Sequence, residues 1–294
     1  MAYSQNWASY QPGCMIFLLD QSGSMSEQFG QAQVGRGRRK CDMVATILNG
    51  FLNELVTTNI IPRPDGTSDV RPRADICVIG YEGSNIGSVL SGALAGRDFV
   101  SLPELQTYPA DIEMRKQKDV DDTGREYEID VPFPVWVRPK AGGGTPMRAA
   151  LQRGRDLAQY WAMNHPDSYP PVIINVTDGA GTDGDPTGIA QEISQISTND
   201  GQALLFSVHL TNLNAQPVLY PLYENELTND KYAKQLFSIS SPIPEPGRVL
   251  LSTWLQRDVP PGARGMIFNG DASSVRLMFN FASKPQTAAL DPNM

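Results

Sequence analysis

The sequence predicts an α/β fold: a doubly wound, mostly parallel sheet with helices on both faces and one antiparallel edge strand. Two observations support this class. Apolar runs of strand length alternate along the chain with longer segments whose apolar residues recur at three-four spacing. The runs are apolar at nearly every position, which is typical of parallel strands buried on both faces.

The elements follow in order along the chain. A lead-in over residues 1–13, polar and ending in Pro-Gly, precedes the first buried strand. Buried strands are expected over residues 14–20, 74–81, 171–178, 203–210 and 265–269. Helices are expected over residues 39–58, 147–164, 187–198, 228–240, 249–256 and 272–281. A Pro-rich linker should occupy 60–73, and the run at 89–95 follows its predecessor closely enough to form the antiparallel edge strand.

One domain is expected over residues 14–282, because the composition does not change enough along the chain to indicate two. An irregular insertion at about 106–138 has extended character and is expected to form a protruding hairpin. Its acidic run at 119–124 has partial calcium-loop spacing, but no flanking helices are evident, so a solvated hairpin tip is preferred. Residues 283–294 form a polar tail.

Composition restricts the classes of partner. The chain has 294 residues and a net charge of −8, which argues against nucleic acid or an anionic membrane as the main partner. Its basic cluster at 36–40 is interpreted as a solvated turn before a helix. Three cysteines without metal-ligand spacing indicate a reducing compartment. The N-terminus has no signal-peptide pattern and no run reaches the roughly 18 apolar residues of a membrane span, so a cytoplasmic location is expected.

Oxygen-bearing side chains follow two of the predicted buried strands. Asp20 ends the first strand, and Ser22 and Ser24 follow at alternate positions of the next loop. Asp178 ends a later strand, and Thr145 closes a Gly-Gly-Gly loop before a helix. The carboxyl ends of parallel strands meet at one edge of such a sheet, where ligands bind at the topological switch point. Carboxylate and hydroxyl oxygens favour Mg²⁺, with Mn²⁺ or Ca²⁺ as alternatives, over zinc or copper.

The ordered set resembles a known family. Asp-x-Ser-x-Ser after a buried strand, Gly-Gly-Gly-Thr-Pro before a helix and Val-Thr-Asp-Gly after a later strand are similar to the three motifs of the metal-ion-dependent adhesion site of von Willebrand factor type A domains. The resemblance covers roughly residues 14–240. In spacing it is most similar to intracellular prokaryotic members, such as those encoded with tellurite-resistance-type or MoxR-type systems.

The resemblance implies a role for each matched residue. Ser22, Ser24 and Thr145 would bind the metal through their hydroxyls, while Asp20 and Asp178 would act through bound waters and by orienting those hydroxyls. Neutral hydroxyl ligands leave much of the ion's charge uncompensated, so a partner protein's Asp or Glu can complete the coordination. The expected function is therefore a non-enzymatic, metal-dependent adaptor or assembly factor, whose oligomeric state the sequence leaves open.

Two other functions remain open. A regulatory subunit of a MoxR- or chelatase-type ATPase, or of a stress-response or defence system, would use the same chemistry on another partner. A metal-dependent hydrolase is disfavoured because no His or Lys is placed near the site as a base. The Gly-rich loop lacks the Gly-Lys-Ser/Thr ending of a phosphate-binding loop.

Several neighbouring residues have simpler interpretations than metal binding. Asp183 and Asp185 are interpreted as a solvated turn and not as further ligands. His209 is interpreted as a strand residue, and Tyr81 and Glu82 are candidates to line the ligand face.

Overall fold

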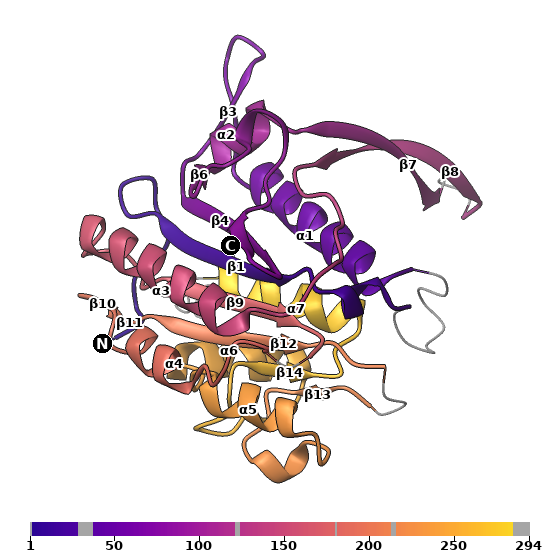
Figure 1. Ribbon diagram of the computed structural model, residues 1–294. Coiled ribbons are helices and arrows are strands. Elements are labelled where there is room, and N and C mark those ends of the chain that lie inside the picture. The colour runs from indigo at the N-terminus through magenta and orange to yellow at the C-terminus, as the bar shows by residue number, and fades with distance from the viewer. Residues whose placement is uncertain (1, 29–37, 121–123, 180, 213–215, 285–294) are drawn as a thin grey trace.

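A computed structural model describes residues 2–28, 38–120, 124–179, 181–212 and 216–284. It shows a mixed α/β architecture with a largely parallel central sheet flanked by helices (Figure 1). The strands run in the order β13-β14-β12-β9-β1-β4-β5, and β6 also pairs with β4. Their bounds are β1 Gly13–Asp20, β4 Ala74–Glu82, β5 Asn85–Ser88, β6 Val100–Ser101, β9 Val172–Thr177, β12 Leu204–His209, β13 Val218–Leu219 and β14 Met266–Phe268.

The registers of the parallel strands bring their carboxyl ends to one edge. Asp20 pairs with Tyr81 of β4, and His209 of β12 pairs with Thr177 of β9. β1 lies between β4 and β9, so the strand order reverses beside it. The last residues of β1 and β9 therefore meet at the switch point, where open α/β sheets leave room for a ligand.

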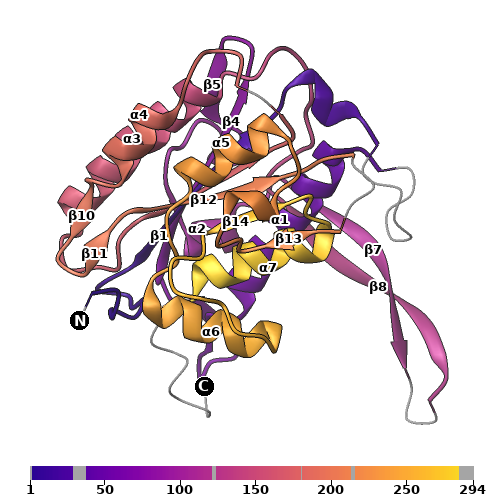
Figure 2. The same cartoon turned by 90° about the horizontal axis from the view of Figure 1, so that it is seen from below.

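Helices cover both faces of the sheet, as Figures 1 and 2 show. Met15, Phe17 and Leu19 of β1 enter one core, whereas Ile16 and Leu18 enter the other, because successive strand residues point to opposite faces. The first core includes α1 (Lys40–Thr57), α2 (Leu102–Thr107), α6 (Glu245–Leu255) and α7 (Ala272–Ser283). The second includes α3 (Met147–Asn164), α4 (Thr187–Ile193) and α5 (Lys231–Ile239).

The predicted parallel strands and helices are confirmed, with shifted ends for several helices: α4 ends at Ile193 and α6 begins at Glu245. The prediction of an antiparallel edge strand at 89–95 is wrong. The antiparallel partner of β4 is β5, reached by a tight turn at Gly83, where φ is +52°. A single antiparallel strand is also too few, because β6 and β13 pair antiparallel as well. The linker at 60–73 contains a small hairpin, β2 (Ile60–Pro62) and β3 (Ser68–Val70).

The insertion forms a long two-stranded arm, made of β7 (Asp111–Val120) and β8 (Glu126–Val135). Figures 1 and 2 both show it standing clear of the sheet. Its base is fixed to α1 by the buried Asn49 side chain, which accepts hydrogen bonds from the backbone N–H groups of Trp136 and Val137. The hairpin prediction is confirmed, while residues 121–123 of the acidic run lie outside the described residues.

No helix in the described part of the chain is long and apolar enough to cross a membrane. Of the predicted polar tail, residues 285–294 lie outside the described residues.

Candidate functional site

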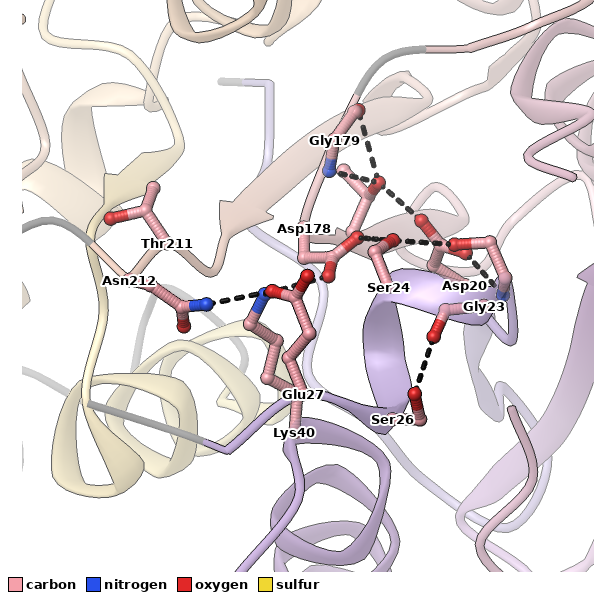
Figure 3. A network of polar contacts seen from close by, with 12 residues as sticks. Asp20, Gly23, Ser24, Ser26, Glu27, Lys40, Asp178, Gly179, Thr211 and Asn212 are labelled. Carbon is pink, nitrogen blue, oxygen red and sulfur yellow. Dashed lines mark hydrogen bonds and ion pairs between the residues drawn. The ribbon is translucent and has the colours of Figure 1, made fainter. Parts of the chain in front are cut away.

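Asp20 is the centre of a hydrogen-bonded chain at the switch point (Figure 3). One carboxylate oxygen accepts the Ser22 backbone N–H at 2.8 Å, and the other accepts the Thr177 hydroxyl at 2.7 Å. The side chain is buried, and burial raises the pKa of Asp20 above its ordinary value, opposed by the hydrogen bonds from Ser22 and Thr177. Both oxygens are therefore oriented by protein donors, one from the loop after β1 and the other from the end of β9.

The two serine hydroxyls lie next to each other in the loop after β1. The Ser22 and Ser24 Oγ atoms are 3.1 Å apart, and Ser24 Oγ donates to Asp178 Oδ1 at 2.7 Å. A short 3-10 turn over Gly23–Ser26 produces this spacing. Four of the five predicted ligands, Asp20, Ser22, Ser24 and Asp178, thus belong to one connected polar group.

Lys40 does not lie where the sequence predicts. The basic cluster predicts a solvated turn, but the Lys40 side chain is only 3% exposed and its ammonium donates to Asp178 Oδ2 at 2.8 Å. The same ammonium donates to Glu27 at 3.1 Å, and Glu27 accepts a further hydrogen bond from Asn212 (Figure 3). The prediction that no lysine lies near the site is therefore also wrong.

Thr145 reaches the same edge through the backbone of its Gly-rich loop. Gly142 N–H donates to the Gln21 carbonyl at 2.7 Å, and the Gly143 carbonyl accepts the Gly23 N–H at 3.0 Å. Thr145 is buried, but among the described residues no hydrogen bond joins its side chain to the serines or aspartates. The loop is therefore attached directly to the serine loop, while the Thr145 hydroxyl stays outside the connected group.

Asp183 holds the start of the helix behind Thr145. Its two oxygens accept the backbone N–H groups of Arg148 at 3.0 Å and Ala149 at 2.8 Å. These are otherwise unpaired donors of the first turn of α3, so Asp183 acts as a helix cap supplied from a distant loop. The solvated-turn interpretation holds for Asp185, which accepts from Thr187 at the start of α4, but is wrong for Asp183.

Two of the other candidates at this edge, Tyr81 and Glu82, have partners outside the connected group. Tyr81 is buried and donates to Asn175 Oδ1 at 2.8 Å, and Glu82 forms an ion pair with Lys140. His209 is buried beside the site, where burial lowers its pKa while the charges of Asp230 and Asp178 act in the opposite direction. Its Nδ1 has no partner among the described residues.

The donor set suits a small hard cation. Octahedral Mg²⁺ with bonds of 2.0–2.1 Å places neighbouring ligand atoms about 2.9 Å apart, close to the 3.1 Å between the serine hydroxyls. The Ser24 hydroxyl donates a hydrogen bond to Asp178, so it accepts in its contact with Ser22 and has one further lone pair available to an ion. The described residues contain no group of three or more His, Cys, Asp or Glu that would hold a metal. The predicted five-residue ligand set has only two carboxylates and would depend on hydroxyls.

Two contributors are missed by sequence reasoning. Thr177 directly precedes Asp178, and its position as the last residue of a buried strand was an available signal. Lys40 offered no comparable signal, because it follows two arginines in a basic cluster and the direction of its side chain depends on where α1 begins.

Comparison with known proteins adds little to this geometry. No family model and no curated protein matches the chain. Among solved structures, the chain is similar to the pilus adhesin RrgA of Streptococcus pneumoniae, with 11% sequence identity and a TM-score of 0.29. That match covers 61% of this chain and spans 22% of the adhesin.

Proposed function

We propose that the chain is a von Willebrand factor type A protein whose doubly wound domain, over residues 14–282, binds a partner through a metal-ion-dependent adhesion site. Mg²⁺ is the proposed ion, held by Ser22, Ser24 and Thr145, with Asp20 and Asp178 orienting the hydroxyls and bound waters. The proposal rests on the continuous series of hydrogen bonds that runs from Thr177 through Asp20 and the serine loop to Asp178.

The proposed activity is recognition and not catalysis. The bound ion would supply an electrophilic position that accepts a carboxylate, and the protein would hold the ligands around it. Lys40 lies close enough to matter, but as an ammonium with carboxylate partners it has no lone pair to accept a proton. It therefore does not provide the base that a hydrolase would need. The proposed setting is a cytoplasmic adaptor or assembly factor, or the related regulatory subunit of an ATPase.

The site itself is tested by measuring Mn²⁺ binding to the purified chain by calorimetry. We expect saturable binding that Asp20→Ala and Ser24→Ala each abolish. Asp185→Ala serves as the matched control, because Asp185 is an exposed carboxylate that accepts from Thr187 at the start of α4 and from Gln235 of α5, away from the proposed ligands. Equal Mn²⁺ binding by all four proteins would contradict the proposal.

Co-purification from cells with and without EDTA tests the partner. We expect a bound protein that is lost with EDTA and with Asp20→Ala, and retained with Asp185→Ala. A complex that survives both treatments would show that recognition does not use this edge of the sheet.

A further inference from the structure

A buried ammonium at the candidate site has no role in the ligand set described above. Lys40 is 3% exposed and bonds to Asp178, whose side chain is 1% exposed, at 2.8 Å. Burying a lysine is unfavourable unless carboxylates compensate its charge. Lys40 is also the first residue of α1, where the helix dipole disfavours a cation. Its position therefore depends on the two carboxylates that it contacts.

The ammonium changes the charge that a divalent ion would meet. Asp20 and Asp178 together supply two negative charges at the buried site. The Lys40 ammonium, which the more exposed Glu27 also contacts, offsets the charge of Asp178 at direct contact. Asp178 Oδ1 accepts from Ser24 and Oδ2 from Lys40, so one carboxylate links the serine hydroxyl to the ammonium. At this burial the charges are weakly screened, so a neighbouring positive charge opposes a dication strongly.

We propose that Lys40 is an internal counter-ion that keeps the affinity of the partner-free site for divalent metal low, so that metal and a partner carboxylate bind cooperatively. This inference rests on the function proposed above. The carboxylate of a partner restores the negative charge that Lys40 cancels, and by linkage the metal and the carboxylate then strengthen each other's binding by the same factor.

Glu27 explains how the ammonium is kept in place. It accepts from Lys40 at 3.1 Å and from Asn212 at 2.7 Å, which ties the loop after β1 to the loop after β12. The hydrogen bond and charge of Lys40 lower the pKa of Glu27. Its side chain is 53% exposed, so Glu27 orients Lys40 from the solvent side while Asp178 holds it from the interior.

The test compares Lys40→Met with Lys140→Met. Lys140 lies before the same Gly-rich loop and pairs with Glu82, but it is 56% exposed, so the control removes the same formal charge from a solvated position. Mn²⁺ binding is measured by calorimetry in chloride and then in acetate of equal ionic strength, with acetate as the carboxylate probe. Lys40→Gln is a second variant in case the methionine protein does not fold.

We expect Lys40→Met or Lys40→Gln to bind Mn²⁺ at least about tenfold more tightly than the wild type in chloride. Acetate should tighten Mn²⁺ binding by the wild type and by Lys140→Met, and much less by the Lys40 variants. The Mn²⁺-induced rise in melting temperature should also be larger for the Lys40 variants, because metal replaces the missing counter-ion of Asp178.

Unchanged or weaker Mn²⁺ binding by folded Lys40 variants would overturn the inference and leave Lys40 as a structural support of Asp178. That result would leave the metal site itself intact. Absence of Mn²⁺ binding in the wild type and the folded variants alike would instead overturn the proposed site, and this inference with it.

Discussion

Replacing Thr177 by valine removes one hydroxyl from the candidate site without changing the size of the side chain. The hydroxyl donates to the buried carboxylate of Asp20 at 2.7 Å and accepts the Gly179 N–H at 3.2 Å. A hydrogen bond to a charged group contributes about 1.5–3 kcal/mol. Because the shape is conserved and Asp20 is buried, we expect Thr177→Val to lower the free energy of unfolding by about that amount at pH 7.

The decrease in the free energy of unfolding caused by Thr177→Val should depend on pH. Burial raises the pKa of Asp20, so ionising this side chain destabilises the folded state. This destabilisation grows as pH rises from the pKa of Asp20 in the unfolded chain to its pKa in the folded protein. Thr177→Val removes a donor that favours the ionised form and raises this pKa further. The destabilisation should therefore be complete above the folded pKa of Asp20 in the variant. It should shrink as pH falls through the folded pKa values of the two proteins, because below both of them the carboxyl is protonated in each protein.

Urea unfolding across a pH series, followed by circular dichroism, measures the effect. Thr187→Val is the matched control, because Thr187 donates to Asp185 at the same 2.7 Å but on the exposed surface. We expect the control to lose less than about 1 kcal/mol, as exposed polar contacts contribute little. A Thr177→Val protein within about 0.5 kcal/mol of the control at pH 7 would refute the reasoning, since the buried carboxylate would not need this donor.

Two further substitutions test the framework around the site by urea unfolding. Asn49→Leu should lower the free energy of unfolding by about 2–4 kcal/mol, because the buried amide is lost and the backbone N–H of Trp136 at the base of the arm is left unpaired. A decrease of less than about 1 kcal/mol would show that another acceptor replaces the amide. Gly265→Ala should lower the free energy of unfolding by at least about 2 kcal/mol, because a Cβ at this position would lie 2.0 Å from the buried ring of Phe206. Gly188→Ala is the control and should be neutral or stabilising, because open space surrounds Gly188 in its helix.

Hydrophobic patterning was enough to predict the parallel strands, the main helices and the residues at the strand ends. The runs that become β1 and β9 are mostly apolar, with Asn175 and Thr177 as the polar positions of β9. They stop at Asp20 and just before Asp178, so hydrophobic patterning located both carboxylates. Local patterns also sufficed for the arm, because a hairpin depends on neighbouring residues in the chain. The edge strand was misplaced because alternating and continuous apolar patterns are weak in a four-residue strand.

The charges that surround those carboxylates could not be predicted from the sequence, because they come from residues far away in the chain. Lys40 is 138 residues from Asp178 in the chain, and the direction of its side chain follows from where α1 begins over the sheet. Asp183 caps a helix that starts 36 residues before it, and so fixes the position of the Thr145 loop. Such contacts depend on how loops that are distant in the chain pack together at one edge of the sheet. The spacing of apolar residues in the sequence does not predict them.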